Sequence, residues 1–216
     1  GKNEYLTDRL NLEAVDFGER NKGKPFFLYL SHYAPHSILN GRPDMVDKYR
    51  KKHPPGPSER DRFYLCQDAG LKGDAGNHWA SHHNPHLAAM LESIDDGIGL
   101  LAKKLEELGL AENTIFIFSS DNGGERKGTS NAPLRGGKSQ LYEGGIRVPL
   151  IVRWPGGKVP EDKICTQPVV THDFYPPLLE AAGIKPDPAQ VLDGVSTLAT
   201  WKNPKAAPKR KALHWH

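Results

Sequence analysis

The chain has 216 residues, a formal net charge of +3 at pH 7 and two cysteines, Cys66 and Cys165. This length is sufficient for one sizeable domain with a core, and so small a net charge argues against a nucleic-acid partner. The sequence contains no run of about 18 apolar residues, so it predicts no membrane span.

The first predicted elements are a helix, a buried strand and a long loop. Thr7 or Asp8 is suited to cap a helix that runs to about Lys22. Residues 26–30 form a short apolar run without alternation, which is typical of a strand buried on both faces of a parallel sheet. Residues 53–85 are rich in Pro, Gly, His and Asp and predict a long loop or insertion, a kind of segment that often carries function.

The clearest predicted element is a long amphipathic helix. Asn84 is a good N-cap and Pro85 suits the first helical position. Gly109 stands where a left-handed C-terminal cap belongs. Between these signals, apolar residues recur at steps of four and three, which indicates a single apolar stripe facing a sheet: Leu87, Leu91, Ile94, Ile98, Leu101, Leu105 and Leu108.

Two more strands and a helix are predicted in the remaining chain. Residues 114–119 and 148–154 have the apolar character of buried strands, and residues 173–182 are predicted to be a helix that Gly183 ends. The alternation of helices and strands predicts an α/β fold with a largely parallel sheet covered by helices. A basic run near the C-terminus is interpreted as a solvated loop, with attraction of an anionic substrate as the alternative: Lys202, Lys205, Lys209, Arg210 and Lys211.

Polar residues follow two of the predicted strands, at the sheet edge where open α/β folds bind ligands. A segment ending in His36 follows the first, and Asp121 and Asn122 follow the second. A carboxylate beside a carboxamide offers two oxygen ligands to a hard cation such as Ca²⁺ or Mg²⁺. An Asx turn is the alternative for Asp-Asn-Gly-Gly, and taken alone it is the more common one.

A dense run of glycines and cations occupies residues 134–149. Its Gly137-Lys138-Ser139 segment is similar to part of a phosphate-binding P-loop, but Ala132 stands where that motif needs glycine and no strand directly precedes it. We therefore reject nucleotide binding. The glycines still let the backbone approach an anion that Lys138 neutralises, and an ordinary surface lysine is the alternative.

Taken in order, these segments resemble the type I sulfatases of the alkaline-phosphatase superfamily. Each short motif is weak, whereas the ordered set is specific and spans nearly the whole chain. The resemblance implies that residues 1–200 are the middle and later part of a catalytic domain of alkaline-phosphatase-like α/β fold, and that residues 201–216 are a basic linker and the start of a following segment. The matching segments are residues 26–32 with Pro35 and His36, 93–97, 118–124, 134–138, 142–149, 171–176 and 192–194.

The resemblance also implies roles for individual residues. Asp121 and Asn122 match two ligands of the family's calcium, with Mg²⁺ as the less favoured ion. Lys138 matches the lysine that holds the sulfate group, and His36 matches the histidine that contacts the sulfate and the leaving oxygen. The implied function is hydrolysis of sulfate esters on a sulfated small molecule or glycan, by a protein exported to the periplasm, the lysosome or the outside of the cell.

One family feature is missing from this sequence. Sulfatases convert the cysteine of a Cys-x-Pro/Ala-x-Arg motif into a formylglycine nucleophile, and neither Cys66 nor Cys165 lies in such a motif. We therefore expect the nucleophile and further calcium-binding aspartates upstream of this chain, and we expect the isolated chain to be inactive. Two other functions remain open: hydrolysis of phosphomonoesters, phosphodiesters or phosphonates, and non-catalytic binding of sulfated glycans.

Other polar residues support weaker expectations. His32 is interpreted as a packed or hydrogen-bonded residue at a strand end, and Arg135 and Arg147 as braces of the glycine-rich loop. Histidines crowd the long loop with spacings that do not match a structural zinc site, so we favour a part in substrate recognition: His78, His82, His83 and His86.

Overall fold

The computed structural model describes residues 4–52, 84–126 and 128–215. The chain divides into two compact units. Unit 1 comprises Gly1–Leu110 with Asn122–Arg147, and unit 2 comprises Ala111–Asp121 with Val148–His216. The loop predicted at residues 53–85 falls almost entirely outside the described residues, and with it the predictions for Cys66, His78, His82 and His83.

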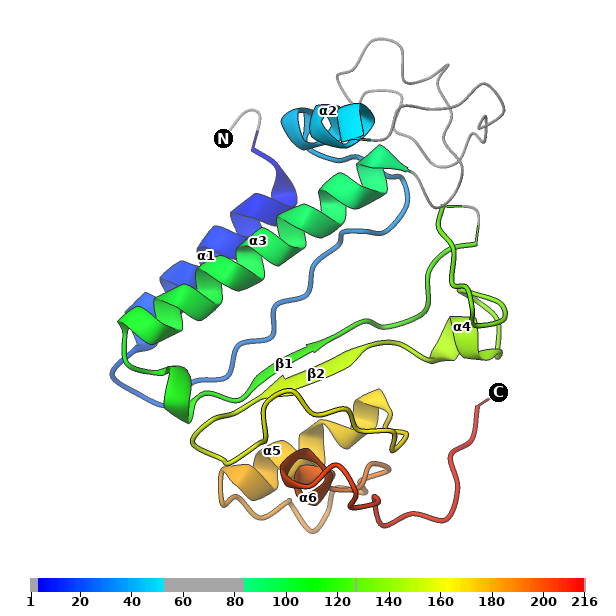
Figure 1. The fold of residues 1–216 in the computed structure, drawn as a ribbon. Coiled ribbons are helices and arrows are strands. Elements are labelled where there is room, and N and C mark those ends of the chain that lie inside the picture. The colour runs from blue at the N-terminus through cyan, green and yellow to red at the C-terminus, as the bar shows by residue number, and fades with distance from the viewer. Residues whose placement is uncertain (1–3, 53–83, 127, 216) are drawn as a thin grey trace. The chain divides into compact units, whose positions relative to one another are not determined.

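Three longer helices pack together in unit 1. Helix α1 (Leu6–Asn21) lies alongside helix α3 (Pro85–Glu107), and helix α2 (Pro43–Lys52) packs against the N-terminal part of α3 (Figure 1). Met45 and Val46 of α2 are buried against Ala89 of α3, with Tyr49 packed beside them. Burying these side chains stabilises the unit by the hydrophobic effect. The sequence analysis did not predict α2.

The caps of α3 confirm the sequence prediction. The Asn84 side chain accepts hydrogen bonds from the backbone N–H groups of His86 and Leu87, at 3.0 and 3.1 Å. At the other end Gly109 has φ of +68°, and Leu110 N–H donates to Leu105 O at 2.8 Å. This is a Schellman ending, which needs a residue that tolerates the left-handed conformation.

The cap predicted for α1 is wrong. Tyr5 occupies the N-cap position and makes no side-chain cap bond. Thr7 is buried inside the helix, and Asp8 accepts a hydrogen bond from Arg42 Nη1 at 2.8 Å. The Asp8 carboxylate, which the sequence pattern assigned to the helix cap, therefore pairs with Arg42 instead.

Residues 26–30 are extended but belong to no strand of the described chain, so the first predicted strand is wrong. Phe27 and Tyr29 are 72% and 80% exposed, whereas Phe26 packs edge-on against Phe17 with ring centroids 5.7 Å apart. A strand needs a neighbour to pair its N–H and C=O groups. The apolar pattern alone does not supply that neighbour.

Unit 2 contains the strand pair that the structure describes. Strands β1 (Phe116–Ser119) and β2 (Leu150–Arg153) fall within the two predicted strands and pair with Phe116 opposite Arg153. The pair is antiparallel, so the parallel expectation is wrong for it. A parallel pair needs a crossover of a dozen or more residues, usually a helix. Among the described residues that connect β1 to β2, the α-helix is the short α4 (Glu143–Ile146).

Two helices complete unit 2. Helix α5 (Tyr175–Ala181) confirms the predicted helix, and Gly183 follows its end with φ of +68°. Helix α6 (Leu198–Lys202) contacts α5 and was not predicted. No helix of the described residues is both long and apolar enough to cross a membrane.

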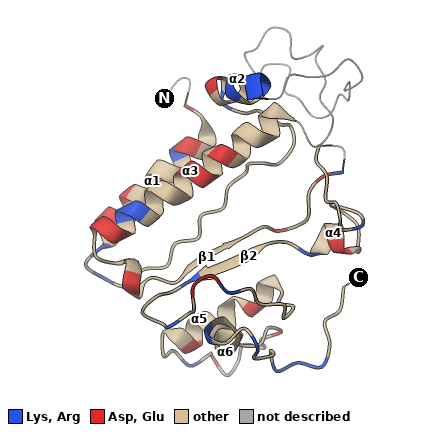
Figure 2. Cartoon of the chain, in the orientation of Figure 1, with Lys and Arg blue, Asp and Glu red and all other residues tan. Residues whose placement is uncertain are grey.

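Residues of both charges recur along the helices of unit 1 (Figure 2). Lys104 pairs with Glu107 at 2.9 Å, and the last turn of α2 carries Arg50, Lys51 and Lys52. In unit 2, Arg210 of the basic run near the C-terminus is not solvated as the sequence predicted. Arg210 pairs with the fully buried carboxylate of Asp173 and is itself only 13% exposed.

Candidate functional site

The glycine-rich segment of residues 122–147 folds back on itself within unit 1. Gly123 N–H donates to Gly145 O at 2.9 Å, and Gly144 N–H donates to Arg135 O at 2.7 Å. These backbone bonds join the start of the segment, directly after Asn122, to its end. Asn122 and Lys138, two of the residues predicted to bind metal and sulfate, thus lie in one hydrogen-bonded loop. Asp121 directly precedes this loop, and His36 comes from a distant part of the chain.

Asn131 organises this loop, and sequence reasoning missed it. Its side-chain Oδ1 accepts from Gly124 N–H at 2.9 Å, and its Nδ2 donates to Gly124 O at 2.9 Å. Gly124 O also accepts from Lys138 N–H at 3.1 Å. The Asn131 side chain therefore positions Gly124 O, which in turn accepts the hydrogen bond from the Lys138 backbone. The sequence indicated only that asparagine favours loops.

Lys138 and His36 meet although 102 residues separate them. Lys138 Nζ lies 3.0 Å from His36 Nε2, and His36 Nδ1 lies 2.6 Å from Ser37 O. A carbonyl oxygen only accepts, so Nδ1 carries the ring proton. Nε2 then accepts a hydrogen bond from the Lys138 ammonium. His36 is exposed and Lys138 is half-buried, so both groups are accessible to a ligand.

Asp121 and Asn122 follow β1 directly, with Asp121 exposed and Asn122 half-buried. Their carboxylate and carboxamide oxygens have the chemistry that Ca²⁺ prefers, and Ca²⁺ takes six to eight oxygen ligands. No group of three or more His, Cys, Asp or Glu side chains gathers in the described part of the chain. Asp121 and Asn122 alone offer fewer oxygen ligands than Ca²⁺ takes.

Two further histidines of the described chain, His86 and His32, are buried and half-buried. His86 is fully buried, and its Nδ1 accepts from Gly41 N–H at 3.3 Å. Burial, and then the charge of Arg50, lower the pKa of His86 to about 4. His32 is half-buried, which lowers its pKa, and neither of its ring nitrogens has a hydrogen-bond partner among the described residues. For His86 the expected part in substrate recognition is wrong, because the side chain is sealed inside unit 1.

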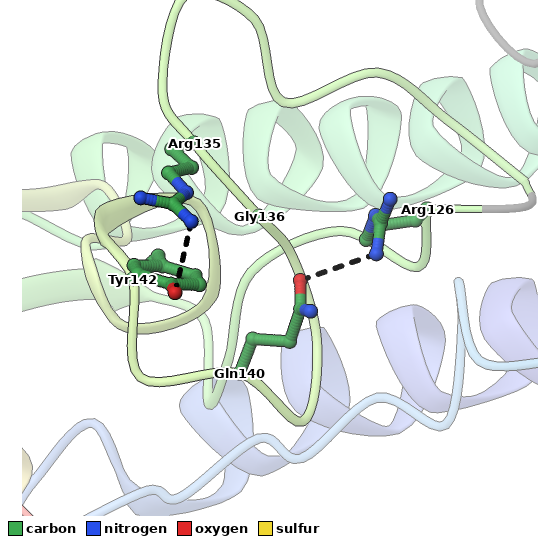
Figure 3. Close-up of a pocket in the computed structure, with 5 residues that line it drawn as sticks. All are labelled: Arg126, Arg135, Gly136, Gln140 and Tyr142. Carbon is green, nitrogen blue, oxygen red and sulfur yellow. Dashed lines mark hydrogen bonds between the residues drawn. The ribbon is translucent and has the colours of Figure 1, made fainter.

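A cavity of about 200 Å³ opens in the same loop and is lined by Arg126, Arg135, Gly136, Gln140 and Tyr142 (Figure 3). Arg135 stacks on the Tyr142 ring, 3.8 Å from its centroid, and donates to the Tyr142 hydroxyl at 3.0 Å. Arg147 pairs with Glu143 at 3.0 Å. Both arginines make the contacts of loop braces, and Arg135 in addition faces the cavity.

The family model described as Sulfatase matches residues 1–184, and the chain therefore belongs to the sulfatase family. It is 35% identical to a protein named "Sulfatase" from Formosa agariphila over 100% of this chain and 37% of that protein. It is 34% identical to the steryl-sulfatase of Rattus norvegicus over 88% of this chain and 28% of the relative. The chain thus spans about a third of the length of these relatives.

A solved structure confirms the fold class. The crystal structure of Ps i-CgsB in complex with k-i-k-neocarrahexaose is 32% identical to this chain. It superposes with a TM-score of 0.74 over 93% of this chain and 39% of the other. The chain is a partial α/β domain of the alkaline-phosphatase-like sulfatase fold.

Proposed function

We propose that the protein containing this chain hydrolyses sulfate esters and that Lys138 and His36 bind the sulfate group. The observation that carries this proposal is the 3.0 Å contact between Lys138 Nζ and His36 Nε2. A cation and an imidazole at this separation both lie within reach of one tetrahedral anion. Membership of the sulfatase family supports the same chemistry.

In this proposal each of the two groups has its own task. Hydrolysis of a sulfate ester builds negative charge on the sulfate oxygens and on the leaving oxygen. The Lys138 ammonium is a fixed positive charge that stabilises the first. His36 is held through Nδ1 by Ser37 O, and its Nε2 lies at Lys138 Nζ, where the proposed sulfate would bind. When that nitrogen carries a proton, it donates the proton to the leaving oxygen as a general acid.

We further propose that Asp121 and Asn122 hold a divalent cation, with Ca²⁺ favoured over Mg²⁺. Support comes from their adjacent oxygen donors at the end of β1. When bound, such an ion supplies positive charge to the sulfate oxygens. The family's nucleophile is a formylglycine. Neither Cys66 nor Cys165 lies in its motif, so the nucleophile is not assigned to a residue of this chain.

The proposed substrate is a sulfated carbohydrate. A relative of 32% identity has been solved in complex with k-i-k-neocarrahexaose, which supports a saccharide. The relative named steryl-sulfatase makes a small sulfated molecule the alternative. Export from the cytoplasm, implied by the family resemblance, is part of the same proposal.

Comparing sulfate release with phosphate release tests this function. The protein, at its full natural length, is assayed with 4-nitrophenyl sulfate and 4-nitrophenyl phosphate, with and without Ca²⁺. We expect turnover of the sulfate ester and a much lower rate for the phosphate ester. Preference for the phosphate ester would assign the chain to phosphoester hydrolysis. Binding of sulfated saccharides without turnover of either ester would assign it to glycan binding.

A further inference from the structure

The cavity lined by Arg126, Arg135, Gly136, Gln140 and Tyr142 contains neither of the residues proposed to bind the sulfate group. Figure 3 shows the two guanidinium groups on opposite sides of it, with Gly136 between them. Both groups come from the loop that carries Lys138. The cavity therefore brings two positive charges together in the loop that also carries Lys138, within the same unit.

The two guanidinium groups retain capacity to bind an anion. Within the described chain, the hydrogen bond of the Arg126 side chain is a long one, 3.5 Å, to Gln140 Oε1. Arg135 donates to the Tyr142 hydroxyl, and neither arginine forms an ion pair with a described carboxylate. A guanidinium has five N–H donors in a planar fork that matches the oxygens of sulfate and carboxylate groups. Most of those donors have no partner among the residues that the structure describes.

Glycines keep the cavity open and close to Lys138. Gly136 has φ of +82°, and a Cβ there would lie 3.0 Å from both Gln140 Oε1 and Tyr142 Cβ. A Cβ on Gly137 would lie 2.6 Å from Arg126 Cγ, so the Arg126 stem rests against the residue that precedes Lys138. Residues two apart in a chain have Cα atoms at most about 7 Å apart, which places Gly136 and Lys138 within the span of a short saccharide.

We propose that this cavity is a subsite for a second anionic group of the substrate, carried on the same saccharide as the sulfate ester that Lys138 and His36 bind. Arg126 is the recognition residue, and Arg135, fixed on Tyr142, is the preformed second cation. The group is a sulfate or a carboxylate, because both present paired oxygens to a guanidinium. This inference rests on the proposed function and adds to it a substrate carrying more than one negative charge.

Calorimetry of saccharide binding tests the subsite independently of turnover. The probes are a monosulfated disaccharide, its disulfated counterpart and a monosulfated disaccharide with a uronic carboxylate, each titrated into the full-length protein. The variants are R126A and a matched control, R20A, which removes an exposed arginine from α1 of the same unit. Circular dichroism of each variant checks that it is folded.

We expect the wild-type protein to bind a doubly charged saccharide at least about tenfold more tightly than the monosulfated one. R126A should remove most of that ratio, and R20A should keep it. Tighter binding of the disulfated probe identifies a sulfate, and tighter binding of the uronate identifies a carboxylate. Equal affinities for all three probes, or an unchanged ratio in R126A, would overturn the subsite. Sulfate release is measured separately, so failure of the subsite and failure of sulfatase activity give different results.

Discussion

Lys138 Nζ lies 3.0 Å from His36 Nε2, and the proton on Nδ1 of the same ring points to Ser37 O. This relationship fixes the tautomer of His36 and places one donor beside one acceptor. We propose that a sulfate group entering between them replaces the imidazole as the acceptor of the Lys138 hydrogen bond.

The loop that presents Lys138 depends on Asn131. Asn131→Ala leaves the N–H and C=O of Gly124 without their side-chain partner, and we expect a loss of about 1–3 kcal/mol in the free energy of unfolding. We also expect kcat for sulfate release to fall, because Gly124 O positions the Lys138 backbone. Asn131→Asp keeps the accepting oxygen and loses the donor, so its kcat should lie between those of wild type and Asn131→Ala. Wild-type kcat in both variants would contradict a positioning role.

The ion pair between Asp173 and Arg210 stabilises unit 2. Burial raises the pKa of Asp173. Arg210 and the N–H groups of Val170 and Val195 together lower it by more than burial raises it, so the pKa lies below its usual value. Arg210→Ala leaves a buried carboxylate without its cation, and we expect a loss of about 3 kcal/mol in urea unfolding. Lys211→Ala, an exposed neighbour, should change stability by less than about 0.5 kcal/mol. Similar effects of the two variants would show that Arg210 is solvated like the rest of the basic run.

His86 makes the stability of unit 1 depend on pH. Its pKa falls from 6.5 to about 4 on folding because it is buried, so the unfolded chain binds more protons between these values. The contribution of neutral, buried His86 to the free energy of unfolding is fully present above pH 6.5. It is lost as the pH falls toward 4, which lowers that free energy by up to about 3 kcal/mol. Urea unfolding at several pH values measures this slope. His86→Gln should flatten the slope and His172→Gln, an exposed histidine of unit 2, should leave it unchanged; an unaltered slope in His86→Gln would exclude His86 as the cause.

Removal of the divalent cation tests Asp121 and Asn122. Treatment of the full-length protein with EGTA should abolish most sulfate release, and added Ca²⁺ should restore it better than Mg²⁺ does, because flexible oxygen sites favour the larger ion. Asp121→Asn removes one negative charge from the site and should raise the Ca²⁺ concentration needed for half-maximal activity. Full activity in EGTA would show that these residues form only an Asx turn.

The sequence predicted those features whose causes are local. The ends of α3 follow from Asn84, Pro85 and Gly109, because caps depend on neighbouring backbone groups. Helix α2 escaped prediction because it depends on burial of Met45 and Val46 against Ala89, which is 43 residues from Val46 in the chain. The extended segment at residues 26–30 reads as a strand, since the sequence shows apolar character but not the presence of a pairing partner.

The candidate site divides in the same way. Lys138, His36, Asp121 and Asn122 were named from motifs, but no spacing in the sequence predicts that Lys138 Nζ contacts His36 Nε2. Such a contact depends on how unit 1 folds. The structural role of Asn131 was not predicted for the same reason. In the sequence, an asparagine that hydrogen-bonds the N–H and C=O groups of Gly124 looks like any other loop asparagine.

A double-mutant cycle on sulfate release tests the central claim most directly. The value of kcat/KM is measured for the full-length wild type, Lys138→Ala, His36→Ala and the double variant, with Lys103→Ala of α3 as the exposed control. If both side chains bind one sulfate group, each single variant should lose about 100-fold or more, and the double variant should lose little beyond the worse single variant. Losses that multiply, or a Lys138→Ala variant as active as Lys103→Ala, would contradict a shared sulfate site.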